Sequence, residues 1–118
     1  MNITIYHNPR CSKSRKTLEI LQNAGIEPRI VAYLDTPPSA VELTALAKRL
    51  EIPVNGLLRR KEDEFREACD LPDLDDDRAL AAWLVDHPRV IERPIVVDET
   101  SGKAIIGRPP ENVNALIA

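Results

Sequence analysis

The chain has 118 residues, of which 43% are hydrophobic and 30% are charged, and its formal net charge at pH 7 is -3. This length and hydrophobic content suit one globular domain, which we expect residues 1–118 to form. The acidic balance, with one Trp, two Tyr and one Phe, excludes a general attraction to nucleic acid. No stretch approaches the roughly 20 apolar residues that span a bilayer, and the N-terminus lacks a signal-peptide pattern. We therefore expect a cytoplasmic protein without a membrane partner.

The first predicted elements are a strand and a helix on either side of a cysteine. Ile3 and Ile5 alternate with polar neighbours, as in a strand, and Leu18 and Leu21 recur at helical spacing. Cys11 therefore falls near a helix N-terminus, where unpaired backbone N–H groups lower the pKa of a thiol.

The segment around this cysteine is basic and rich in turn-forming residues. Asn8-Pro9 is a turn signal, so successive N–H groups can point into one concavity that suits an oxyanion. We predict that Cys11 is a nucleophile and that His7 supports it by a hydrogen bond or, when protonated, by its charge. The alternative for His7 is an ordinary hydrogen-bonded residue at a strand end. The residues predicted to form a supporting anion loop are Asn8, Arg10, Ser12, Lys13, Ser14 and Arg15.

Ser14 occupies the position at which a dithiol oxidoreductase carries its second cysteine, so the motif reads Cys-x-x-Ser. A covalent adduct on Cys11 must then be resolved by Cys69 or by an external thiol such as glutathione, through a mixed disulfide. Cys69 has acidic neighbours in place of the cations beside Cys11, so we interpret Cys69 as structural. Two separate cysteines form neither a disulfide framework nor a zinc-ligand pattern. We therefore expect no bound metal and no bound cofactor.

A second strand and a run of helices follow in the chain. Residues 30–34 are predicted to form a buried strand, which completes a β-α-β unit. Ser39 and Glu42 form a capping box for a helix that reaches Leu50. Further helices are predicted over residues 56–60, 63–68 and 76–86. The carboxylates at 75–77 resemble a catalytic or metal-binding cluster, but we interpret them as the cap of the last of these helices.

The final third returns to strand character. Residues 94–97 and 104–106 predict a β-hairpin, and Pro110 lies at the start of a last short helix. The order of elements is that of an α/β, thioredoxin-like domain with a four-stranded mixed sheet and flanking helices. A helical insertion at about 39–90 separates the second and third strands. Arg93-Pro94 suits the cis-proline turn that lies beside the redox cysteine in such folds.

Five short motifs are spread over nearly the whole chain. They are Ile5–Arg15, Tyr33–Pro38, Leu57–Arg59, Arg93–Val97 and Gly107–Pro109. In this order they resemble the motifs of the glutaredoxin-coupled arsenate reductase (ArsC) family, and the chain is most similar to its short members. The resemblance implies that Cys11, with His7 before it, attacks arsenate. It also implies that glutathione acts as co-substrate on the adduct, arsenite leaves, and glutaredoxin reduces the mixed disulfide.

The same resemblance implies that Arg59, Arg93 and Arg108 bind the oxyanion. Guanidinium groups match the tetrahedral set of acceptors on arsenate better than ammonium groups do. Arg60 competes with Arg59, because neighbouring positions of a helix point about 100° apart and only one can face the site. We choose Arg59 from the register of its motif.

Two other functions remain open on this scaffold. One is a glutathione-linked thiol oxidoreductase or sensor whose substrate is not arsenate. The other is a regulator that resembles the Spx proteins and binds RNA polymerase. Ser14 in place of a second cysteine, together with the arginines, favours the enzyme over the regulator. We expect the protein to be a monomer.

Overall fold

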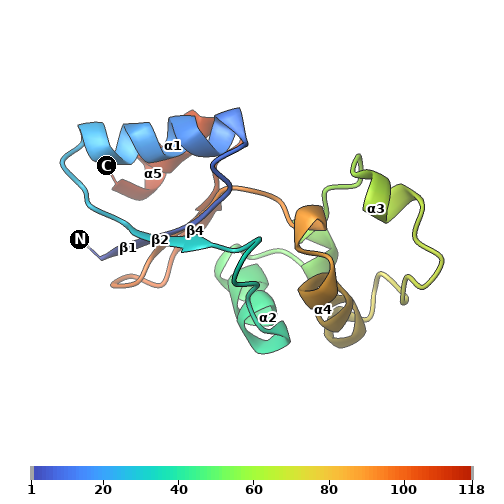
Figure 1. Ribbon diagram of the computed structural model, residues 1–118. Coiled ribbons are helices and arrows are strands. Elements are labelled where there is room, and N and C mark those ends of the chain that lie inside the picture. Colours follow the sequence, from blue (N-terminus) through green and yellow to red (C-terminus); the bar gives the residue numbers. More distant parts are fainter. Residues whose placement is uncertain (1, 118) are drawn as a thin grey trace. The chain divides into compact units, whose positions relative to one another are not determined.

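The computed structural model describes residues 2–117, and its strands form a four-stranded sheet in the order β2-β1-β3-β4 (Figure 1). The strands are β1 (Ile3–His7), β2 (Arg29–Ala32), β3 (Ile95–Asp98) and β4 (Ala104–Ile106). Strand β1 pairs parallel with β2 and antiparallel with β3, and β3 pairs antiparallel with β4. This is the predicted mixed sheet of a thioredoxin-like fold, with the predicted hairpin at its end.

One face of the sheet is covered by α1 (Ser12–Asn23), the 3-10 helix η3 (Pro110–Val113) and α5 (Asn114–Ile117) (Figure 1). Ile3 and Ile5 share this face because alternate residues of a strand point the same way. The buried core between the layers consists of Ile3, Ile5, Leu21, Val96 and Val113. Each such side chain stabilises the fold by roughly 1.5–3 kcal/mol relative to exposure. The core therefore ties α1, which carries Cys11 at its start, to the sheet.

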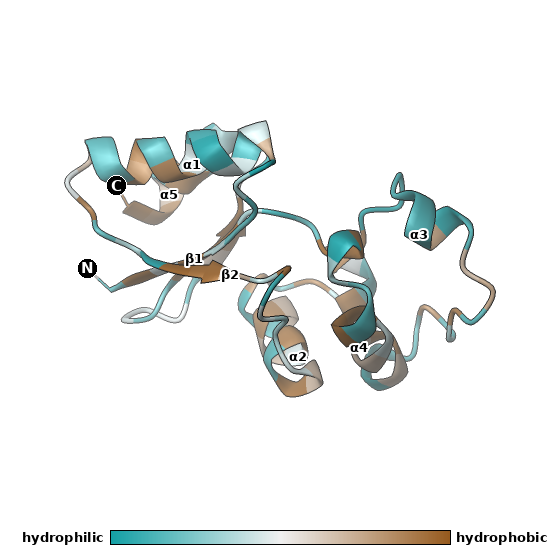
Figure 2. Cartoon of the chain, in the orientation of Figure 1, coloured by the Kyte–Doolittle hydropathy of each residue, from teal (hydrophilic) through white to brown (hydrophobic). Residues whose placement is uncertain are grey.

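The prediction of a buried strand over residues 30–34 is wrong in its burial and its end. Strand β2 stops at Ala32, and Ile30 is 50% exposed. The apolar run, brown in Figure 2, lies at one edge of the sheet. An edge strand has a neighbour on one side only, so its side chains bury less surface than those of a central strand. Tyr33, in the turn that follows, is buried.

By its internal contacts the chain divides into two compact units. The first comprises the sheet and its helices, up to Tyr33 and again from Arg93 onward, and the second comprises Leu34–Glu92. The second unit contains the predicted helical insertion at about 39–90. That both units belong to a single domain stays a prediction.

The second unit is built from α2 (Ala40–Arg49), α3 (Asp63–Arg66), α4 (Asp77–Asp86) and the 3-10 helices η1 (Val54–Leu57) and η2 (Pro88–Val90). Helices α2, α4 and η1 contact one another, and the apolar stripes on α2 and α4 are visible in Figure 2. Buried leucines of this unit are Leu43, Leu46, Leu57, Leu58, Leu80 and Leu84. The Glu42 N–H donates to Ser39 Oγ over 3.1 Å, as expected for the predicted cap of α2.

The predicted helix over residues 56–60 is wrong. Helix η1 ends at Leu57, and Leu58 is extended, with φ -76° and ψ 129°, and forms a β-bridge with Ile91. Arg59 and Arg60 therefore follow an extended residue, so the helical angle between neighbours does not decide which of them faces a site. Helix α3 is also shorter than predicted, since it ends at Arg66.

The acidic run before α4 acts as a helix cap. Asp76 Oδ1 accepts a hydrogen bond from the Ala79 N–H over 3.1 Å, and Asp77 lies in the first turn. This confirms the capping interpretation. Within residues 2–117 the structure has no group of three or more His, Cys, Asp or Glu side chains placed to hold a metal ion. No helix in the same range has the length and apolar character to cross a membrane.

Candidate active site

Cys11 lies at the N-cap of α1, directly after the turn that follows β1. Its backbone is extended, with φ -93° and ψ 122°, and its N–H donates to Asn8 O over 3.0 Å. The Arg15 N–H donates to Cys11 O over 3.0 Å, which is the first bond of the helix. The first N–H groups of a helix have no intrahelical acceptor. The sulfur of this half-buried residue is therefore placed where those groups can reach it, as predicted.

The pKa of the Cys11 thiol is lowered because several donors outweigh the effect of burial. Burial raises the pKa, while hydrogen bonds from the backbone N–H groups of Ser14 and Lys13 lower it. The Arg93 guanidinium lowers it further by a hydrogen bond, and the charge of Arg108 adds to the effect. These groups all stabilise the anionic form, so more of Cys11 is thiolate at neutral pH than for an ordinary cysteine.

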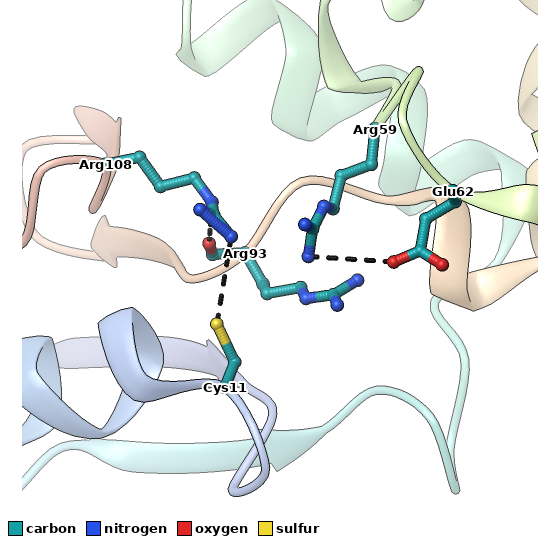
Figure 3. Close-up of polar contacts among 5 residues, drawn as sticks. All are labelled: Cys11, Arg59, Glu62, Arg93 and Arg108. Atoms are coloured by element: carbon teal, nitrogen blue, oxygen red, sulfur yellow. Dashed lines mark hydrogen bonds and ion pairs between the residues drawn. The ribbon is translucent and has the colours of Figure 1, made fainter.

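Two of the three predicted arginines act on this sulfur. Arg108 Nη2 lies 3.8 Å from Cys11 Sγ, and Arg108 Nε donates to the Arg93 carbonyl oxygen over 3.0 Å (Figure 3). Arg93 lies just before β3, and Arg108 just after β4. Both precede a cis proline, Pro94 and Pro109. The first cis bond is the predicted one, and the second was not predicted.

His7 and Ser14 form a buried pair behind the thiol. His7 Nδ1 lies 2.7 Å from Ser14 Oγ, which also accepts the Asn8 N–H over 3.0 Å. Ser14 is fully buried. Burial, and after it the positive charge of Arg15, lower the pKa of His7, so the ring is neutral at pH 7. Its contribution is thus a hydrogen bond to the turn that holds Cys11, and not the added charge that the sequence left open.

The other residues of the predicted anion loop act through the backbone or lie at the surface. The Arg10 N–H donates to Asn8 Oδ1 over 3.0 Å, and Arg15 Nη1 donates to Pro9 O over 2.9 Å. The side chains of Arg10, Ser12, Lys13 and Arg15 are exposed. Lys13 reaches the thiol by its N–H. The anion loop is therefore mainly a set of backbone donors held by side-chain bonds.

Arg59 belongs to the second unit. Its Nη1 lies 3.8 Å from Glu62 Oε1 (Figure 3), and its N–H donates to Val90 O over 2.6 Å. Its proximity to the thiol stays a prediction.

Cys69 is exposed, with Sγ 3.7 Å from Glu67 O. The interpretation of Cys69 as structural is thus not supported by burial.

Gly107 and Thr17, to which the sequence assigned no role, lie beside the site. Gly107 directly precedes Arg108, and Thr17 lies one helical turn after Ser14. Both residues are buried. Thr17 Oγ1 donates to the Lys13 carbonyl oxygen, and Gly107 lies beside Thr17 and Pro94. One feature of the sequence could have revealed this role. Gly107 stands directly before Arg108 in the motif Gly107-Arg108-Pro109, and no predicted turn requires a glycine there.

Comparison with known proteins supports the same family. The ArsC family model matches residues 6–116. The chain is 46% identical over 117 residues to the arsenate reductase of Neisseria meningitidis serogroup A, covering 98% of this chain and 97% of that protein. It is 45% identical to an arsenate reductase of Escherichia coli, covering 95% and 78%. The solved arsenate reductase from Vibrio cholerae superposes with a TM-score of 0.86 at 45% identity, covering 98% and 97%. The chain therefore belongs to the ArsC family and has a thioredoxin-like fold.

Proposed function

We propose that this chain is an arsenate reductase whose nucleophile is the Cys11 thiolate. The observation that carries the proposal is the set of donors at one sulfur: two N–H groups at the start of α1 and the guanidiniums of Arg93 and Arg108. The same donors that stabilise a thiolate can hold the oxygens of an incoming dianion. A structural cysteine would gain nothing from them. The relatives named arsenate reductase support the choice of oxyanion.

In the first step the Cys11 sulfur attacks the arsenic atom. A sulfur–arsenic bond forms, one arsenic–oxygen bond breaks, and that oxygen leaves as water after taking protons from solvent. Arg93 and Arg108 offset the negative charge of arsenate, which would otherwise repel the thiolate. Arg59 is proposed as the third guanidinium on the same oxyanion, taken from its motif.

In the second step the thiolate of glutathione attacks the Cys11 sulfur. A disulfide forms, the sulfur–arsenic bond breaks, and its electron pair stays on arsenic, which leaves as arsenite. A glutaredoxin thiolate then attacks the glutathione sulfur and releases the Cys11 thiolate. Ser14 stands where a resolving cysteine would be, so the resolving thiol comes from elsewhere, and we assign this role to glutathione. We place the reaction in the cytoplasm, since this chemistry needs a reduced glutathione pool.

The proposal is tested by arsenate-dependent oxidation of NADPH in an assay coupled through glutathione, glutathione reductase and glutaredoxin. We expect activity in the wild type, none in Cys11→Ser, and wild-type activity in Cys69→Ser. Activity that survives Cys11→Ser would reject the nucleophile. Loss of activity in Cys69→Ser would instead make Cys69 the resolving thiol.

A second experiment tests the arsenate site without turnover. We expect arsenate to slow alkylation of Cys11 near pH 7, measured peptide by peptide, and Arg93→Ala to remove this protection. The exposed Cys69 is an internal reference whose alkylation should not respond to arsenate. Equal alkylation of Cys11 with and without arsenate would reject the site and favour a thiol oxidoreductase with another substrate.

A further inference from the structure

The segment that carries Arg108 lies beside α1, at the level of Thr17. The Gly107 N–H donates to Pro94 O over 2.9 Å, and the Arg108 N–H donates to Ile106 O over 2.9 Å. Helix η3, which follows directly, contacts α1. The backbone at 107–108 is therefore held between β3 and α1, and the Arg108 side chain extends from it to the thiol.

Gly107 leaves no room for a side chain. A Cβ at this position would lie 2.6 Å from Thr17 Oγ1, 2.8 Å from Pro94 Cγ and 3.2 Å from Thr17 Cγ2. These distances are shorter than van der Waals contact. Gly107 does not have the positive φ of Gly25 or Gly102, so the requirement for glycine is one of space and not of backbone conformation.

The atoms that Gly107 meets are not free to move aside. Thr17 is fully buried, is β-branched, and donates from Oγ1 to the Lys13 carbonyl oxygen over 2.8 Å. Pro94 is a buried ring adjacent to Arg93. A side chain at 107 would therefore displace the segment that carries Arg108 away from α1.

Thr17 also donates a hydrogen bond to the peptide group that binds the thiol. The carbonyl of Lys13 and the N–H of Ser14 belong to one peptide group. Thr17 donates to that carbonyl, and the N–H donates to Cys11. Hydrogen bonds in such a chain polarise and strengthen one another. One threonine thus contacts both the peptide that binds the sulfur and the glycine before Arg108.

We propose that Gly107 and Thr17 are positioning residues for arsenate reduction, whose direct contact sets how closely the Arg108 guanidinium approaches Cys11. This inference rests on the proposed function for its effect on arsenate, but the contact acts on the thiol whether or not arsenate is the substrate. Displacing a charged group by about 1 Å can cost on the order of 100-fold in rate.

The test measures the thiol pKa from the pH dependence of Cys11 alkylation, without arsenate. Gly107→Ala is expected to raise this pKa and to lower kcat/KM for arsenate on the order of 10- to 100-fold. Gly25→Ala is the matched control, because it strains a positive φ of 78° in open space away from the site. It should lower the melting temperature and leave the thiol pKa unchanged. An unchanged thiol pKa in Gly107→Ala would overturn the proposal.

A double-mutant cycle separates the contact from a general loss of packing. Thr17→Ala removes the nearest atoms, so Gly107→Ala should raise the thiol pKa less in that background than in the wild type. Additive effects would overturn the proposal.

Thr17→Val and Thr17→Ser keep the test decisive if Gly107→Ala does not fold. The valine loses the bond to Lys13 O and should raise the thiol pKa, whereas the serine keeps the hydroxyl and should not. Equal pKa values of Cys11 in these two variants would also reject the role of Thr17.

The positioning role and the proposed substrate can fail separately. If the thiol pKa responds as expected but neither the wild type nor any variant reduces arsenate, the positioning role stands and the proposed substrate fails.

Discussion

At the scale of single residues, the proposed chemistry depends on the balance of effects at one sulfur atom. Burial of Cys11 opposes ionisation, and four donors or charges favour it, with a net lowering of the thiol pKa. Backbone N–H groups are fixed by the helix, so the two arginine side chains are the adjustable part of this balance. Substitution of either arginine should therefore change the thiol in a measurable way.

We predict that the pKa of Cys11 lies below the ordinary value of a cysteine thiol. Removing a positive charge 3.8 Å from the sulfur destabilises the thiolate, so Arg108→Ala should raise the pKa of Cys11. The measurement is the rate of iodoacetamide alkylation against pH, with Cys69 followed in the same sample. A profile of Arg108→Ala that overlays the wild type would contradict this assignment.

The lowered pKa of His7 predicts a pH dependence of stability. The folded protein binds the His7 proton less readily than the unfolded chain does, so stability is greatest above about pH 6.5 and decreases as the pH falls below it. NMR titration of the His7 ring should give a midpoint below 6.5. Denaturation of His7→Gln from pH 8 to 5 should show a smaller loss of stability than the wild type. A His7 midpoint at or above 6.5 would disprove the buried, neutral ring.

At the scale of elements, the junction of β1 and α1 is held by hydrogen bonds between buried side chains and the backbone of the turn. Ser14 Oγ bonds both His7 and the Asn8 N–H from inside the fold, and the Asn8 carbonyl accepts the Cys11 N–H. Two hydrogen bonds therefore hold the turn: one from the Asn8 N–H to the buried Ser14 hydroxyl, and one from the Cys11 N–H to the Asn8 carbonyl oxygen. Its geometry is expected to depend on Ser14 far more than on the exposed Ser12.

Ser14→Ala should lower the free energy of unfolding by about 1–3 kcal/mol, because it leaves a buried N–H and a buried ring nitrogen without their partner. Ser12→Ala is the matched control at an exposed position of the same helix and should change stability by less than about 0.5 kcal/mol. Urea denaturation measures both. Equal effects of the two substitutions would show that the Ser14 network contributes little.

At the scale of the whole molecule, the residues that we propose to bind the oxyanion are divided between the two units. Cys11, Arg93 and Arg108 come from the sheet unit, and Arg59 comes from the helical unit, where Glu62 partners it. A carboxylate on a guanidinium competes with an incoming oxyanion for the same donors. We therefore propose that arsenate displaces Glu62 from Arg59 when it binds.

This predicts a contrast between neighbouring residues. Arg59→Ala should weaken arsenate binding roughly 10-fold or more, as expected for the loss of a charge-assisted hydrogen bond. Arg60→Ala should leave binding unchanged. Glu62→Gln should strengthen binding by up to about 5-fold, since the partly exposed pair contributes at most about 1 kcal/mol. Binding is measured by arsenate protection of Cys11 from alkylation. A larger effect of Arg60→Ala than of Arg59→Ala would reassign the third arginine.

Local patterns in the sequence were sufficient for much of the fold. Alternation in β1, the turn at Asn8-Pro9 and the helical spacing after it place Cys11 at the start of a helix. The caps at Ser39 and Asp76 each accept a hydrogen bond from the N–H group three residues further along the chain. These features depend on contacts between near neighbours in the chain, which a linear sequence displays directly.

What only the tertiary structure decided depends on contacts between distant residues. The apolar run at 30–34 does not reveal that β2 lies at an edge, and the bridge from Leu58 to Ile91 ends η1 before Arg59. Likewise the bond from Arg108 to Arg93 O, and the lack of room at Gly107, arise where β3, β4 and α1 meet. The sequence by itself determined that a helix begins directly after Cys11 and that the chain belongs to the ArsC family. Packing between segments some 90 residues apart decided which charges and which small residues surround the sulfur, because steric fit and low dielectric exist only once those segments are together.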